Sequence, residues 1–219
     1  MALKAIICDL DGTLIDGLPG IEFSVDRALA ELNFPARELP LAPLIGPPIR
    51  QIFSQLVDAD ERQLLSLEAA FRTCYDSAGW QKTVLHPHAA FTLNGLSRAG
   101  VELFIATNKP AFATGRILEA LGIQPLFRHV LCRDGRTPPF ESKGDMLQAL
   151  IRMYNLPPAE CLYVGDTEED YRAGLEAGMQ IAIVRHATDN LKRESIYPDG
   201  IILKHLTELL DRIEIKEIA

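Results

Sequence analysis

Short apolar segments that alternate with amphipathic helical patterns constrain what this chain of 219 residues can fold into. The apolar segments cover residues 4–8, 101–106, 129–132, 161–164 and 180–184. Helical patterns lie near residues 88–99, 111–121, 143–155 and 169–177. This alternation indicates βαβ units and a parallel sheet covered on both faces. We expect an edge strand within 200–203 and a last helix over about 205–213.

The interval between the first two apolar segments breaks this alternation. Its patterns are helical, and they cover residues 21–32, 49–57 and 60–77, with a proline-rich link at 40–48. Proline disfavours a helical conformation in the residue before it, so the link separates the first two helices. We therefore expect an α/β protein in which a Rossmann-like parallel-sheet core carries an inserted α-helical cap domain. The expected core covers 1–15 and 83–219, and the expected cap covers 16–82.

Composition and charge are typical of a soluble globular protein that does not bind nucleic acid. Apolar residues make up 47% of the chain and charged residues 24%, which is ordinary for such a protein. The formal net charge of −8 argues against a nucleic-acid partner, because phosphate backbones are bound by basic surfaces. A small anionic substrate remains compatible with this charge, since a few local cations and a metal ion can outweigh it. The sequence does not indicate an oligomeric state.

The N-terminus and the cysteines favour a cytoplasmic location. Residues 1–4 run directly into the first strand pattern, without the long apolar stretch of a secretory signal. No apolar stretch approaches the ~20 residues that span a bilayer, so no membrane partner is expected. The cysteines are far apart and form no CxxC pair, so we expect free thiols and no structural zinc. They are Cys8, Cys74, Cys132 and Cys161.

Two carboxylates follow the first apolar segment, in the order Asp9-Leu10-Asp11-Gly12-Thr13. In an extended backbone, Asp9 and Asp11 point to the same face. Close carboxylates repel each other unless a cation or a shared proton relieves them. Gly12 permits a sharp bend or a close approach to the backbone. The pattern favours a site for a hard metal ion and a nucleophile, and the alternative is an Asp-Gly turn with solvated carboxylates.

Polar residues also follow two later segments. Asp166 and Asp170 follow 161–164, and their spacing of four would put them on one face of a helical first turn. Thr107 follows 101–106, and Lys143 begins an amphipathic pattern. Ligands of parallel α/β sheets lie outside the carboxyl ends of strands, so these residues are expected to converge. The structural alternatives are a helix N-cap for Thr107, a solvated helix residue for Lys143 and a dipole-favoured carboxylate for Asp170.

As an ordered set, these residues resemble the motifs of the haloacid dehalogenase (HAD) superfamily. The set is Asp9-x-Asp11-Gly12-Thr13, Thr107, Lys143 and Gly165-Asp166-x-x-x-Asp170, and the match covers nearly the whole chain. A finer resemblance, to phosphoglycolate-phosphatase-like members with a helical cap, is carried by residues 101–110 and 164–178. One departure is Gly144, which follows Lys143 where close relatives usually carry proline.

The resemblance implies a phosphatase that forms an aspartyl-phosphate. It implies that Asp9 attacks phosphorus. Asp11 would protonate the leaving oxygen and then activate the water that hydrolyses the intermediate. Thr107, Asn108 and Lys143 would bind the transferred phosphoryl group.

The same resemblance implies Mg²⁺ as the cofactor. Asp9, Asp166 and the backbone carbonyl of Asp11 would hold the ion, in keeping with its preference for oxygen ligands. Asp170 would lie behind them and hold Lys143 or a metal-bound water.

The expected substrate is a small phosphorylated metabolite of the phosphoglycolate or sugar-phosphate type. The presence of Asp11 favours phosphate esters, because the carbon–halogen-cleaving members that resemble this chain lack that residue. Arg50 follows 46–48, where relatives place a specificity loop, and its planar fork suits a distal carboxylate or phosphate. The alternative for Arg50 is a role as a surface arginine. His86 and His88 could suggest a metal site, but no third histidine is nearby in the sequence, so we expect a structural role for them.

Two other functions fit the same residues. A sugar phosphomutase of the β-phosphoglucomutase type shares the core motifs and differs mainly in the cap. A non-catalytic binding protein on the same fold is also compatible, because fold alone does not imply function.

Overall fold

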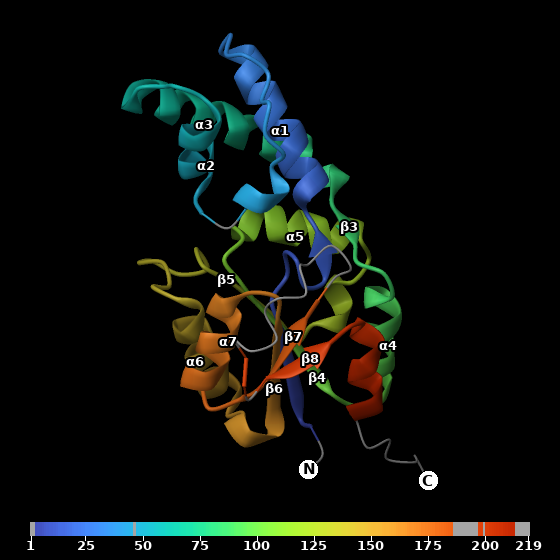
Figure 1. The fold of residues 1–219 in the computed structure, drawn as a ribbon. Helices are drawn as coiled ribbons and strands as arrows, with labels where there is room; N and C mark the ends of the chain where they lie inside the picture. Colours follow the sequence, from blue (N-terminus) through green and yellow to red (C-terminus); the bar gives the residue numbers. More distant parts are fainter. Residues whose placement is uncertain (1–2, 46, 186–196, 199, 213–219) are drawn as a thin grey trace. The chain divides into compact units, whose positions relative to one another are not determined.

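The computed structural model describes residues 3–45, 47–185, 197–198 and 200–212 (Figure 1). The chain forms two compact units, one made of Met1–Asp16 with Leu85–Ala219 and the other of Gly17–Val84. Each unit is described by itself below. Within the described residues, no helix combines the length and the apolar character that crossing a membrane requires.

A six-stranded parallel sheet, in the order β5-β4-β1-β6-β7-β8, forms the centre of the larger unit. The strands are β1 (Ala5–Cys8), β4 (Glu102–Thr107), β5 (His129–Cys132), β6 (Cys161–Gly165), β7 (Gln180–Val184) and β8 (Ile201–Leu203). Strand β1 pairs with β4 on one side and β6 on the other, and all its residues are buried. The α/β prediction is confirmed, and β8 is the edge strand expected within 200–203.

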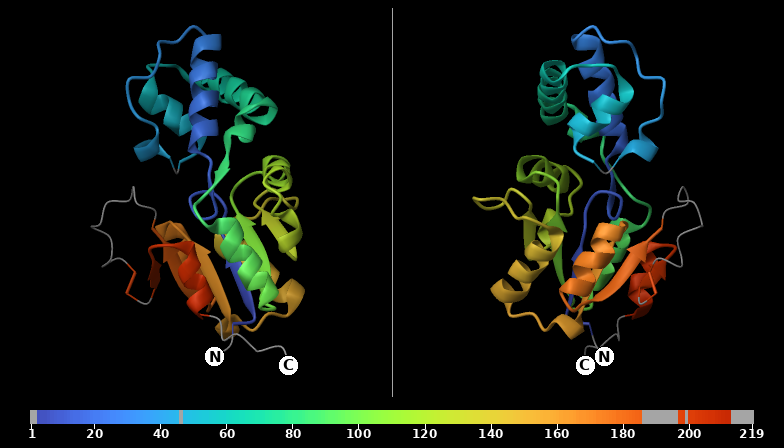
Figure 2. Two further views of the ribbon diagram at one scale, coloured as in Figure 1. Left: turned by 90° about the vertical axis from the view of Figure 1, so that its right-hand side faces the viewer. Right: turned by 60° about the vertical axis from the view of Figure 1, so that its left-hand side comes forward.

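Helices cover both faces of this sheet (Figure 2). They are α4 (Ala89–Arg98), α5 (Ala111–Ala120), α6 (Lys143–Tyr154) and α7 (Glu168–Glu176), with 3₁₀ helices η3 (Gln124–Leu126), η4 (Pro158–Glu160) and η6 (Leu206–Arg212). Side chains of α6 and α7 pack in one buried cluster with Ile7, Phe104 and Tyr163 of the sheet. Helix α4 packs against η6. The helix expected over about 205–213 is the 3₁₀ helix η6, and the last residue of that range, Ile213, lies outside the described residues.

Local capping fixes where the helices begin at the carboxyl edge of the sheet. The hydroxyl of Ser142 accepts a hydrogen bond from the Asp145 N–H at 3.1 Å, which starts α6 at Lys143. Thr167 and Asp170 form a capping box that starts α7. His88, at the N-cap of α4, has a left-handed backbone with φ of 65°. These caps place Lys143 and Asp170 in the first turns of their helices.

The second unit is helical and has its own apolar core. Its elements are α1 (Leu18–Glu31), η1 (Ala42–Leu44), α2 (Ile49–Leu56), α3 (Glu61–Ser77) and η2 (Gly79–Lys82). Val25, Leu29, Phe53 and Leu67 are among its buried side chains. Helix α1 begins before the expected residue 21, because Pro19 fits the first turn, where its missing N–H is not needed.

The two-residue strands β2 (Ile15–Asp16) and β3 (Val84–Leu85) form a small separate sheet that the sequence did not predict. The cysteines are free thiols as expected. Those of β1, β5 and β6 are buried, and Cys74 is half-buried.

Gly20 tests the packing of the helical unit. A Cβ there would lie 2.3 Å from the backbone oxygen of Gly79, a contact that requires backbone movement. We expect Gly20→Ala to lower the free energy of unfolding by about 1–3 kcal/mol, as overpacking does. The matched control is Gly115→Ala in α5, where a Cβ meets nothing within 4 Å. That change should stabilise by about 0.5–1 kcal/mol, because alanine favours a helix. Urea unfolding curves that shift in the same direction for both variants would contradict this packing.

Candidate active site

The two acidic segments lie side by side at the carboxyl edge of the sheet. Cys8 of β1 is opposite Val164 of β6, and the Asp9 N–H donates to the Val164 carbonyl at 2.8 Å. Asp9 and Asp166 therefore follow directly after two neighbouring strands. One carboxylate oxygen from each of Asp9, Asp166 and Asp170 lies within 4.8 Å of the others. The structure thus brings together three of the residues that the sequence singled out.

The chain turns sharply after Asp9. The Leu10 carbonyl accepts hydrogen bonds from the N–H groups that close the turn, and Gly12 has φ of +78°. Glycine adopts this left-handed conformation without a steric penalty. A Cβ on Gly12 would lie 2.2 Å from Oδ2 of Asp166, so the approach of that carboxylate also requires glycine. The Thr13 hydroxyl donates to Asp166 at 3.2 Å. Both reasons for a glycine at this position are observed.

Lys143 is buried between two carboxylates. Its Nζ lies 3.2 Å from Oδ1 of Asp9 and 2.5 Å from Oδ1 of Asp170, and its side chain is 4% exposed. Burial lowers the pKa of Lys143, but the Asp9 and Asp170 carboxylates outweigh burial and raise that pKa above its usual value. Lys143 is therefore an ion-paired ammonium and not a solvated helix residue.

Asp170 connects the start of α7 to this ion pair. Its Oδ2 accepts from the N–H of Thr167 at 3.0 Å and from that of Asp166 at 3.3 Å. Burial raises the pKa of Asp170, but Lys143 and the hydrogen bonds from Thr167 and Tyr163 lower it overall. The expectation that Asp166 and Asp170 share a face of a helical turn is wrong. Asp166 precedes the N-cap residue, and the capping loop itself brings the two together.

Tyr163 is a site residue that the sequence analysis missed. It lies in β6, is fully buried, and donates to Oδ1 of Asp170 at 2.7 Å. Burial and the Asp170 carboxylate raise the pKa of Tyr163 well above its usual value, so its hydroxyl remains a donor. The sequence pattern indicates only that it lies in the apolar segment 161–164. The available signal was its hydroxyl, because a tyrosine in a buried strand usually finds a polar partner.

Strand β4 places its last residue, Thr107, at the same edge. Thr107 is buried, and its hydroxyl accepts from the Lys109 N–H at 3.1 Å. It is not a helix N-cap, since Pro110 holds that place in α5. Asn108 donates to both carboxylate oxygens of Glu169 at 3.2 Å. The buried Oδ1 of Asn108 has no hydrogen-bond partner among the described residues.

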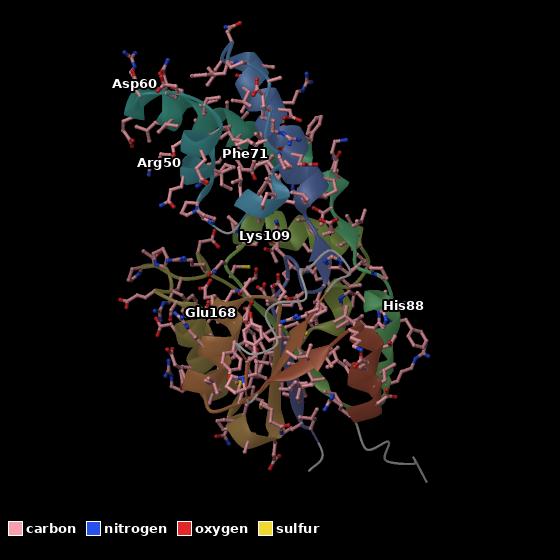
Figure 3. All side chains as sticks on the ribbon, viewed as in Figure 1. Arg50, Asp60, Phe71, His88, Lys109 and Glu168 are labelled. Atoms are coloured by element: carbon pink, nitrogen blue, oxygen red, sulfur yellow. The ribbon has the colours of Figure 1, made fainter. Side chains whose placement is uncertain are left out.

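Asp11 lies outside the buried cluster and pairs with a second lysine that the sequence analysis did not select. Both of its carboxylate oxygens lie 3.0 Å from Nζ of Lys109, which Figure 3 labels. The Asp11 side chain is 38% exposed, and that of Lys109 is 7% exposed. Asp11 does not belong to the group of three carboxylates that can hold a metal ion. Its expected metal contact, through the backbone carbonyl, stays a prediction.

The group of three carboxylates fits a divalent cation. Asp9, Asp166 and Asp170 bring three potential negative charges close together, and Lys143 supplies one positive charge. Burial raises the pKa of Asp9 well above its usual value, and the neighbouring carboxylates oppose the lowering effect of Lys143. A bound cation would offset this crowding, and oxygen donors suit Mg²⁺. Among the described residues, His86 and His88 belong to no such group.

Arg50 belongs to the helical unit, at the start of α2 (Figure 3). Its guanidinium pairs with Glu61 at 2.9 Å and with Glu68 at 3.4 Å, and its side chain is 43% exposed. Gly46, in the loop before it, lies outside the described residues. A substrate contact of Arg50 stays a prediction.

The hydrogen bond from Tyr163 to Asp170 can be tested by stability. Tyr163→Phe should lower the free energy of unfolding by about 1.5–3 kcal/mol, the range for a hydrogen bond to a charged group. Tyr154→Phe is the matched control, because that hydroxyl lies 3.1 Å from the ring nitrogen Nδ1 of His129. A loss of about 0.5–1.5 kcal/mol is expected there. Equal losses in thermal unfolding would show that Asp170 gains no special support from Tyr163.

The chain is similar to known proteins in both sequence and structure. Residues 3–178 match the model of the haloacid dehalogenase-like hydrolases. A phosphoglycolate phosphatase of Pseudomonas putida is 31% identical over 217 residues, which cover 94% of this chain and 78% of that protein. One of Escherichia coli K12 is 31% identical over 199 residues, covering 80% and 79%. A haloacid dehalogenase-like hydrolase from Streptococcus pneumoniae superposes with a TM-score of 0.81 at 25% identity, over 96% of this chain and 98% of the other. The chain therefore belongs to the haloacid dehalogenase-like hydrolase family.

Proposed function

We propose that this phosphatase of the haloacid dehalogenase family hydrolyses a small phosphorylated metabolite through an aspartyl-phosphate on Asp9, with Mg²⁺ as cofactor. The observation that carries the proposal is the setting of Asp9. It is buried at the end of β1, ion-paired with Lys143 and grouped with Asp166 and Asp170. Relatives named phosphoglycolate phosphatases support a substrate of the phosphoglycolate type, and a sugar phosphate is the second substrate type that we propose.

The first step forms the covalent intermediate. Lys143 holds one carboxylate oxygen of Asp9, which leaves the other for attack on phosphorus. As the new bond between Asp9 and phosphorus forms, the ester P–O bond breaks, and the leaving oxygen takes a proton from Asp11. Thr107, Asn108 and Lys143 bind the transferred phosphoryl oxygens at the edge of the sheet.

The second step releases phosphate. Asp11 accepts a proton from a water molecule whose oxygen attacks the phosphorus of the aspartyl-phosphate. The bond between phosphorus and Asp9 then breaks, which regenerates the free carboxylate. The same residue thus serves as acid in the first step and as base in the second.

The proposed metal site uses Asp9, Asp166 and the backbone carbonyl of Asp11. Asp170 lies behind it and holds Lys143. When bound, Mg²⁺ supplies positive charge that favours the approach of the anionic phosphate to the Asp9 carboxylate. Asp166 is held for this role by the Thr13 hydroxyl.

The helical unit Gly17–Val84 is proposed to serve as the cap domain and to determine substrate choice. Arg50 is its candidate for a distal anionic group, because a guanidinium binds a carboxylate or phosphate through two parallel hydrogen bonds.

Asp9→Asn tests the nucleophile. The amide has nearly the same shape but is a poor nucleophile, so phosphate release should fall by about 1,000-fold or more without loss of the fold. The assay is phosphate release from a panel of small phosphate esters. Asp58→Asn, at an exposed position in the helical unit, is the control and should keep full activity.

Two outcomes would change this proposal. Retention of more than a few per cent of activity by Asp9→Asn, with deamidation excluded by mass spectrometry, would end the covalent mechanism. Isomerisation of a sugar phosphate by the unmodified protein, without phosphate release, would identify a phosphomutase.

Removal of metal tests the cofactor. A chelator should abolish phosphate release, Mg²⁺ should restore it, and Ca²⁺ should not, because its larger and looser coordination shell changes the attack geometry. Mg²⁺ should also raise the melting temperature of the protein, since a ligand that binds the folded state stabilises it. Asp166→Asn should lose that thermal shift. Full activity in excess chelator would contradict the metal requirement.

A further inference from the structure

Lys109 contacts the carboxylate of Asp11, a proposed catalytic group. Lys109 is not one of the motif residues to which the sequence analysis assigned a role. It follows β4 in the short segment before α5 (Figure 3). Its Nζ donates to Oδ1 and to Oδ2 of Asp11, at 3.0 Å each. Among the described residues, no other side chain hydrogen-bonds to the Asp11 carboxylate. An almost fully buried lysine therefore contacts both oxygens of a carboxylate that is itself partly exposed.

The backbone of Lys109 is held in place on both sides. Its N–H donates to the hydroxyl of Thr107 at 3.1 Å, and its carbonyl accepts from the hydroxyl of Thr114 at 3.5 Å. Both threonines are buried. The N–H of Ala111, just beyond Pro110, donates to Asp134 at 2.8 Å. The ammonium therefore extends from an anchored segment, and Asp11 is held against a fixed point.

We propose that Lys109 is a positioning residue that fixes the Asp11 carboxylate for its proton transfers. The inference rests on the proposed role of Asp11. A carboxylate has about four acceptor sites, and Lys109 occupies one on each oxygen, so sites remain for the leaving group and for water. General acid–base catalysis depends on this placement, because the carboxyl group must lie within hydrogen-bond reach of the proton it transfers.

A competing role for Lys109 is direct binding of the transferred phosphoryl group. The two roles differ in how they depend on the leaving group. The p-nitrophenolate ion leaves without a proton, whereas an alkoxide requires one. Loss of a positioning residue for Asp11 therefore lowers kcat/KM for alkyl esters selectively, because kcat/KM reports the steps up to departure of the leaving group and not the later attack of water. Loss of a phosphoryl ligand lowers kcat/KM for both kinds of ester.

The test compares Lys109→Met with the unmodified protein on p-nitrophenyl phosphate and on glycerol 3-phosphate. A general acid contributes about 10²–10⁴-fold, so partial loss of its placement should lower kcat/KM for the alkyl ester by about 30-fold. The expected loss on the aryl ester is about threefold or less. The inhibition constant of inorganic phosphate should stay within about twofold, because the phosphoryl site is not removed. Lys204→Met, which removes an exposed positive charge, should change neither substrate.

Other results overturn the inference. Equal losses on both esters, with weaker inhibition by phosphate, would make Lys109 a phosphoryl ligand. An unchanged kcat/KM on both esters, or a higher kcat/KM on the alkyl ester, would show that Lys109 has no positioning role. If Lys109→Met does not fold, Lys109→Gln takes its place. Its neutral amide can still donate to Asp11 but lacks the positive charge, and the same selective loss of kcat/KM is required of it, at about five- to tenfold.

Asp11→Asn separates this inference from the proposed function. That variant should itself lose more kcat/KM on the alkyl ester than on the aryl ester, and adding Lys109→Met to it should cause no further selective loss of kcat/KM. If Asp11→Asn lowers kcat/KM equally for both esters, the proposed acid role of Asp11 fails. If Asp11→Asn lowers kcat/KM selectively for the alkyl ester and Lys109→Met does not, the proposed function is supported and the positioning role of Lys109 is excluded.

Discussion

The buried ion pair of Lys143 with Asp9 and Asp170 is the constraint on which the rest of the site depends. Buried charges are costly unless they are paired and their remaining hydrogen-bond sites are filled. Tyr163 and Thr167 fill those of Asp170. To meet these requirements, β1 and β6 must be neighbours, and α6 and α7 must begin where they do. The need to pair these buried charges therefore constrains which strands are neighbours and where the two helices begin.

The carboxylates of the site differ in burial and in their partners, and these differences match the different roles proposed for them. Asp9 and Asp170 are buried and share one ammonium, whereas Asp11 is partly exposed and has a lysine of its own. Asp166 is held by Thr13 and lies against the backbone of Gly12. A nucleophile benefits from a fixed, dry position, and a group that exchanges protons with water needs access to it. This division agrees with the proposed chemistry.

The sequence predicted those parts of the structure that depend on local patterns. The strands followed from apolar segments, the order of the elements from their alternation, and the two functions of Gly12 from its lack of a Cβ. The convergence of the strand ends followed from the parallel sheet, and the contact of Asp170 with Lys143 followed from the family resemblance. Other pairings between distant segments were not indicated by the sequence. Lys109 and Asp11 are separated by 98 positions, and no periodicity connects them. Tyr163 was missed because strand patterns report burial and not the partner of a buried hydroxyl. The prediction for Asp166 was wrong because a spacing of four residues puts two side chains on one helix face only when both residues lie in the helix. Asp166 precedes α7.

The residues proposed for the chemistry all belong to one unit, and Arg50 belongs to the other. Its ion pairs with Glu61 and Glu68 do not argue against a substrate contact. Exposed pairs of this kind contribute about 0–1 kcal/mol each, because water screens them and ordering long side chains costs entropy. Breaking them for the proposed contact with a substrate anion would therefore cost the protein little stability. In contrast, removing one partner from the buried pairs of Lys143 would leave an uncompensated charge. We therefore expect substitutions around Arg50 to destabilise the protein far less than substitutions around Lys143, so that under the proposed function substrate choice can vary while the site around Asp9 is retained.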